Sequence, residues 1–100
     1  MADLNISVPH NLPQDEVLRR LQSFIQNART QYANHIQNFQ EAWNGNTGTF
    51  DGTVMGQHVV GTVAVNSSDV TVQGRLPAIA FFMRGRIENG VREQLGRLLS

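Results

Sequence analysis

From residue 36 to residue 76 apolar side chains alternate with polar ones, and short turn-like stretches interrupt the alternation three times. A period of two is typical of strands with one buried face, because successive side chains point to opposite faces of a sheet. The interruptions fall at Asn44-Gly45, Met55-Gly56-Gln57 and Asn66-Ser67-Ser68-Asp69, and Asn-Gly favours a tight hairpin turn. The pattern therefore predicts a four-stranded antiparallel meander. Its inner face is expected to carry Phe39, Trp43, Phe50, Gly52, Val54, Val59, Gly61, Val63, Val65, Val70, Val72, Gly74 and Leu76.

A strand and a helix are expected before the meander. Leu4, Ile6 and Val8 alternate with polar residues up to Pro9, which predicts a strand. Pro13 and the two acidic residues that follow it are typical of the first turn of a helix. Apolar residues at three- and four-residue spacing give this helix one face that is expected to join a core. They are Val17, Leu21, Ile25, Ala28 and Tyr32, with Leu18 and Phe24 at the margins.

A second helix is expected to close the chain from Pro77 onward. Its apolar line consists of Ile79, Met83, Ile87, Val91, Leu95 and Leu98 or Leu99. The resulting order is strand, helix, four-stranded antiparallel meander, helix, which defines one α+β domain over residues 1–100 with a curved sheet packed on helices. Glu41 departs from this pattern, because strict alternation places it on the inner face. A bulge or an edge position is expected there.

Cysteine is absent from the chain, so disulfides, thiolate chemistry and cysteine-ligated zinc or iron are excluded. A reducing, cytoplasmic location is expected. The first residues lack a basic region followed by an apolar run, and the sequence contains no apolar stretch of about 18 residues. Neither a secretion signal nor a transmembrane segment is expected.

The sequence offers no set of residues for catalysis. His10, His35 and His58 stand far apart and form no His-x-x-x-His or His-x-His pair, so they are expected to be ordinary surface or turn histidines without a metal. The serines and acids are scattered singly, without a nucleophile-elbow context. No glycine-rich phosphate loop is present, and no cofactor is expected. These patterns indicate a binding protein and not an enzyme.

Charge is unevenly distributed although the net charge is zero. Residues 1–74 hold three arginines and six acids, whereas residues 75–100 hold five arginines and two acids. A partner-binding surface is predicted at the start of the closing helix, formed by Phe81, Phe82, Arg84 and Arg86. The alternative is that the aromatic residues are core and the arginines a solvated face. Nucleic acid is disfavoured as a partner, because phosphate binding needs a broader basic surface.

Three glycines fall on the inner face of the predicted sheet, each on a different strand. Glycine inside a strand marks strong curvature or a close backbone approach. A sheet bent around a helix is one interpretation of Gly52, Gly61 and Gly74. The other is a ligand cavity beneath the closing helix, which would also be lined by Met83 and Ile87.

Several short motifs, in this order and spacing, resemble the polyhydroxyalkanoic acid system (granule-region) family. They are Ile6-x-Val8-x-His10-x-Leu12, Trp43-Asn44-Gly45, Phe50, Gly61-Thr62-Val63-Ala64-Val65, Val70-x-Val72 and Ile87-Glu88. The resemblance implies a bacterial protein linked to storage-polyester granules, with no established catalytic residues. The order of elements is also similar to the TATA-binding-protein-like (TBP-like) and helix-grip folds.

Two functions are therefore predicted. The first is a non-enzymatic accessory protein of polyhydroxyalkanoate granules that touches polymer or a granule protein through the Phe81 to Arg86 region. The alternative is a binder of a small hydrophobic ligand, held between the curved sheet and the closing helix. A homodimer is also expected, because a short sheet has edges that a partner could cover.

Overall fold

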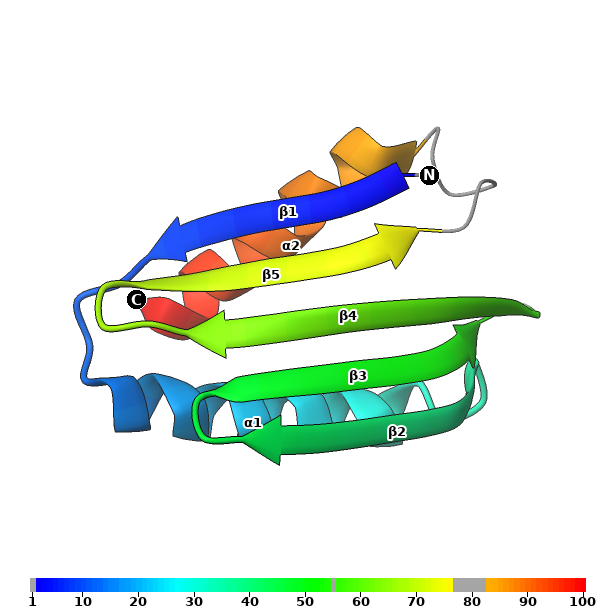
Figure 1. The fold of residues 1–100 in the computed structure, drawn as a ribbon, viewed down its shortest axis with the longest axis horizontal. Coiled ribbons are helices and arrows are strands. Elements are labelled where there is room, and N and C mark those ends of the chain that lie inside the picture. Colours follow the sequence, from blue (N-terminus) through cyan, green and yellow to red (C-terminus); the bar gives the residue numbers. More distant parts are fainter. Residues whose placement is uncertain (1, 55, 77–82) are drawn as a thin grey trace.

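The strands form one antiparallel sheet in the order β1-β5-β4-β3-β2. The computed structural model describes residues 2–54, 56–76 and 83–100 (Figure 1). Within these ranges the elements are β1 (Ala2–Pro9), α1 (Gln14–Gln31), β2 (Ile36–Asn44), β3 (Thr47–Val54), β4 (Gln57–Val65), β5 (Asp69–Leu76) and α2 (Arg84–Leu99). The predicted α+β class and the four-stranded meander are confirmed. The expected helix start at Pro77, with Ile79, Phe81 and Phe82, lies outside the described residues.

Strand β1 forms the edge of the sheet opposite to β2. β1 pairs with β5 along its whole length, from Ala2 opposite Leu76 to Pro9 opposite Asp69. The chain then crosses through α1 to β2 at the other edge. Both edge strands consequently run in the same direction, as the arrows in Figure 1 show.

Both helices pack on one face of the sheet, α2 behind β1 and β5 and α1 behind β2 and β3 (Figure 1). The core between these layers consists of Leu4, Ile6, Val8, Val17, Leu21, Val65, Val70, Leu95 and Leu99. Burying one such side chain stabilises the fold by about 1.5–3 kcal/mol. The opposite face is polar and solvated, as the sequence predicts, and even Val60 on it is 41% exposed.

Strand β2 contains the bulge that the sequence leads us to expect near Glu41, although it lies a few residues earlier. The register with β3 shifts between Gln37 and Gln40, where Asn38 has a φ of 55°. Asparagine tolerates this left-handed conformation better than most residues. The extra residue brings Ile36 to the inner face, where it and Phe39 both approach Gly52. Glu41 itself stays on the inner face, opposite Phe50.

The hairpin between β2 and β3 turns one residue later than predicted. Asn44 pairs with Thr47, so Gly45 and Asn46 form the two-residue loop, and Gly45 has a φ of +61°. Next to this turn Trp43 lies across Gly48. A Cβ on Gly48 would meet the indole ring at 2.9 Å, which explains why glycine stands at this position.

His10 is buried, with 6% exposure, and joins two loops. Its Nδ1 accepts a hydrogen bond from the Leu12 backbone N–H at 3.1 Å, so the ring proton sits on Nε2. Nε2 then donates to the Asn66 carbonyl at 3.0 Å, in the turn between β4 and β5. His10 lies in a loop, as expected, but it is not a surface histidine, because the turn between β4 and β5 covers it.

Candidate ligand-binding groove

The two helices run in opposite directions, meet at one end and diverge toward the other (Figure 1). At the joined end Arg20 of α1 donates from Nη1 to the carbonyls of Leu98 and Ser100, at 2.9 and 3.2 Å. These carbonyls belong to the end of α2, where a cation also complements the helix dipole. We call this region the closed end.

Glu16 holds Arg20 in place. Its Oε2 accepts hydrogen bonds from Arg20 Nε at 2.8 Å and from Arg19 Nη2 at 2.6 Å. The bond from Arg20, followed by that from Arg19, lowers the pKa of the Glu16 carboxyl below its ordinary value of 4.5. The carboxylate is therefore the form that supports the contact between the helices.

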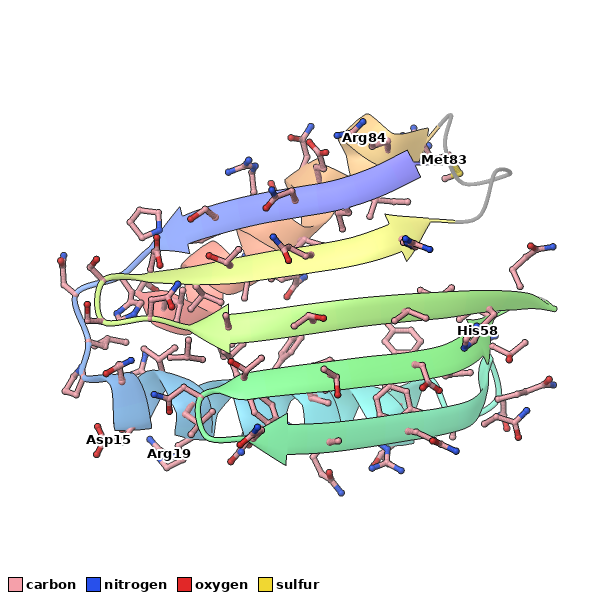
Figure 2. All side chains as sticks on the ribbon, viewed as in Figure 1. Asp15, Arg19, His58, Met83 and Arg84 are labelled. Carbon is pink, nitrogen blue, oxygen red and sulfur yellow. The ribbon has the colours of Figure 1, made fainter. Side chains whose placement is uncertain are left out.

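Burial falls along both helices with distance from the closed end. On α1, Val17 and Leu21 are buried, but Tyr32, which caps the far end of the helix, is 51% exposed. On α2, Leu99 and Leu95 are buried, but Met83, which precedes the helix, is 50% exposed. The predictions that Tyr32 and Met83 belong to the core are wrong, since the helices there have moved apart. Figure 2 places Met83 and Arg84 at the opposite end of the molecule from Asp15 and Arg19.

Between the diverging helices lies an apolar groove of about 470 Å³, which we call the helix groove. Its floor is formed by Val63 and Val72 of the sheet. The α1 wall consists of Leu21, Phe24 and Ile25, and the α2 wall of Ile87, Gly90, Val91, Gln94 and Leu95. Of these lining residues only Gln94 has a polar side chain, so the groove suits an aliphatic ligand.

Next to the helix groove are two smaller hollows, toward the end of the molecule where the helices lie apart, which we call the open end. The first, of about 230 Å³, shares Ile25 and Val63 with the helix groove and is also lined by Arg29. The second, of about 210 Å³, shares Ile36, Phe39 and Phe50 with the first. Because neighbouring hollows share lining residues, the three lie in a row, which we call the apolar depression. A row of apolar hollows suits an extended chain better than a compact molecule.

An ion pair stands beside the middle hollow, between α1 and β2. Arg29 Nη1 donates to Glu41 Oε1 at 3.4 Å, and the guanidinium lies 4.9 Å from the centre of the Phe39 ring. The other Glu41 oxygen, Oε2, accepts from the Trp43 indole N–H at 2.7 Å. The acidic residue that the alternation places on the inner face is thus satisfied by an arginine and a tryptophan.

The five residues predicted to line a ligand cavity are distributed over separate places. Gly52 and Gly61 line the last hollow, and Ile87 lines the helix groove. Gly61 and Gly74 also line a depression of mixed polarity and about 410 Å³, together with Asn5, Thr62, Gln73 and Arg75 of the solvated face. Met83 is exposed at the start of α2. A groove between the helices therefore takes the place of the expected cavity beneath the closing helix.

Of the four residues predicted to bind a partner, the structure describes two. Arg84 donates from Nε to Glu88 at 3.0 Å, one turn along α2. Arg86 is exposed. Phe81 and Phe82 lie outside the described residues. The two arginines belong to the first turn of α2 and are absent from the lining of the helix groove.

Apart from Ile87, the residues that line the helix groove are not predicted as a site from the sequence. Helical spacing places Ile25 in a core-facing stripe and Phe24 at its margin, and it gives Gly90 no role in binding. The one sequence feature that could have indicated the groove is the width of the apolar stripe on α1, because the stripe is wider than packing against a single neighbouring element requires. Among the described residues no group of three or more His, Asp or Glu side chains could hold a metal ion, and neither helix there combines the length and apolarity that a membrane span requires.

No curated protein matches the chain. Among solved structures it is similar to the crystal structure of TTHA0849 from Thermus thermophilus, with 10% identity, a TM-score of 0.35 and coverage of 98% of this chain and 92% of that chain. This TM-score is too low to establish a shared fold, and the TBP-like or helix-grip assignment stays a prediction. Residues 4–99 match the family described as polyhydroxyalkanoic acid system protein. The resemblance seen in the sequence motifs is confirmed, and the chain belongs to the polyhydroxyalkanoic acid system family.

Proposed function

We propose that this protein is a non-enzymatic accessory protein of the polyhydroxyalkanoate system that binds the polyester itself, with a segment of the polymer lying in the helix groove. The observation that carries the proposal is the elongated apolar groove between α1 and α2. Polyhydroxyalkanoates are aliphatic chains linked by esters, so they offer a long, flexible and largely apolar strand. The family description suggests the polymer as the ligand, and the apolar groove is a surface to which such a chain could bind.

The proposal places the protein in the cytoplasm at the granule surface. The residues at the start of α2 have a smaller role in it than the sequence suggests, because Arg84 is engaged by Glu88 and neither Arg84 nor Arg86 lines the groove. A homodimer through an edge strand remains a proposal, which sedimentation equilibrium would test.

A second candidate function uses the same groove. A carrier of small aliphatic molecules, such as monomeric hydroxyacyl esters, would also need an apolar groove of about 470 Å³. A carrier would bind the monomer in solution, but it would have no affinity for solid polymer. The two functions therefore differ in one measurable property.

The test is co-sedimentation with amorphous polyhydroxybutyrate particles and, separately, titration with methyl 3-hydroxydecanoate in solution. The Gly90→Leu variant fills the groove, because a Cβ at Gly90 meets no atom within 4 Å and the position lines the groove. Gly96→Leu is the matched control on the same helix, since its Cβ also meets nothing and it lies outside the groove lining. Both changes replace a poor helix former, so folding is expected to be kept.

We expect the natural protein and Gly96→Leu to sediment with the particles and Gly90→Leu to remain in solution. Binding of the monomer without binding of particles would favour the carrier. Binding that survives Gly90→Leu but is lost in an Arg84→Ser, Arg86→Ser variant would return the site to the start of α2. Absence of both kinds of binding would refute both functions.

A further inference from the structure

Glu41 is the acidic residue that breaks the apolar pattern of the inner face. Its side chain is 16% exposed and sits at the edge of the apolar layer opposite Phe50. The Trp43 indole needs a hydrogen-bond acceptor there, but a glutamine would also provide one. What the negative charge adds is an ion pair with Arg29, which neutralises the guanidinium.

Arg29 is the cation that lines the first of the two smaller hollows. Among the described residues that line the helix groove and its two smaller hollows, the only ionisable side chains are Arg29 and Asp51. Asp51 pairs with Gln40 and Val60 and carries its carboxylate on the solvated face, 4.0 Å from His58 Nε2. Because Glu41 engages Arg29, the depression holds no uncompensated positive charge among these residues.

This arrangement favours neutral ligands over anionic ones. A free carboxylate that entered the groove would lose water without gaining an unpaired cation, and it would lie near the negative charge of Glu41. A neutral ester carbonyl loses less hydration free energy than a carboxylate and is not repelled by Glu41, and a guanidinium N–H that Glu41 does not use can donate to it. The Phe39 ring holds the guanidinium beside the hollow, at 4.9 Å.

We propose that Glu41, by pairing with Arg29, makes the groove selective for neutral ester-linked aliphatic chains and against free hydroxy acids. The inference rests on the proposed function, since it names the ligand class of the same groove. Glu41 is a specificity-determining residue that acts through Arg29. The protein would thereby distinguish the polymer from the acids released when the polymer is hydrolysed.

The test compares two probes that differ in charge, methyl 3-hydroxydecanoate and 3-hydroxydecanoate, by calorimetric titration at pH 8. The natural protein is expected to bind the ester about tenfold more tightly than the acid. Glu41→Gln keeps an acceptor for Trp43 but frees Arg29, so it should strengthen binding of the acid and abolish or invert the preference. The double variant Arg29→Gln, Glu41→Gln should lose the gain for the acid, because that gain depends on the freed guanidinium.

Glu93→Gln is the control, since it removes one negative charge from an exposed position of α2 outside the groove lining. It should leave the ester-to-acid ratio unchanged. A ratio that is the same in the natural protein and in Glu41→Gln would overturn the inference while leaving the proposed function intact. Failure of the natural protein to bind either probe or polymer particles would overturn both.

Discussion

The closed and open ends of the helical layer have the same kinds of sequence pattern but differ in how firmly they are joined. At the closed end Arg20 holds the end of α2, His10 holds the turn between β4 and β5, and Gln14 Nε2 donates to the Val65 carbonyl at 3.1 Å. At the open end the described polar contact from α1 to the sheet edge is the Arg29–Glu41 pair at 3.4 Å. The apolar stripes at the open end therefore stay partly exposed.

This difference shows that an apolar stripe can have two uses in one small domain. Near the closed end it fills the core, and Val17, Ile6 and Val70 are fully buried there. Farther along the same helices it lines a groove, and Phe24 is 39% exposed. An apolar hollow lined by such side chains is typical of ligand-binding sites. The closed end supplies stability, which allows the open end to remain unfilled.

The largest expected effect separates the buried part of the α1 groove wall from its exposed part. Leu21→Ala should lower the free energy of unfolding by about 2–5 kcal/mol, because the side chain is 3% exposed and a cavity would remain. Phe24→Ala, one turn away, should cost less than about 1.5 kcal/mol, since much of the ring already contacts water. Urea denaturation measures both. Equal losses would mean that the open end is packed as firmly as the closed end.

An intermediate effect is expected for the buried histidine. His10→Ala removes the partner of the Leu12 N–H and of the Asn66 carbonyl and leaves a cavity at a buried position, so we expect a loss of about 1–3 kcal/mol in the free energy of unfolding. His58→Ala is the control, because that side chain is 65% exposed. It should change stability by less than about 0.5 kcal/mol. A similar loss in the two variants, measured by thermal denaturation, would show that His10 does not hold the closed end.

The smallest effect concerns pH. Because the folded-state pKa of Glu16 is lowered, its carboxylate stabilises the fold above the ordinary value of 4.5, and this contribution is lost as the pH falls through the folded-state pKa. The difference in stability between the natural protein and Glu16→Gln should therefore be largest near neutral pH and shrink below 4.5. Urea denaturation across this range measures it. A difference that does not change with pH would contradict a role for the charged form.

Much of the fold could be predicted, because alternation and helical spacing report which side chains share a face. This pattern is enough to predict the five strands and the start of α1. The open ends of the apolar stripes were not. Tyr32 and Met83 continue the helical spacing, but whether they are buried depends on whether the opposite layer extends over them. Spacing within one helix contains no information on that distance.

The candidate site was predicted only in part. Ile87, Gly52 and Gly61 do line the apolar depression, but the two walls of the groove come from helices in opposite halves of the chain. Their separation is set by the angle at which α1 and α2 cross the sheet. Phe24 and Gly90 become groove residues only because that angle opens the space between them.

The elements, the apolar face of each one and the family of the chain can be recognised without a structure, since they are encoded in local spacing and in the order of short motifs. The pairing of β1 with β5 and the meeting of Arg29 with Glu41 emerge only when the chain is folded. The groove between the apolar stripes of α1 and α2 likewise forms only in the folded chain. Those outcomes depend on how separate elements meet in space, because the contacts that settle them join residues far apart in the chain.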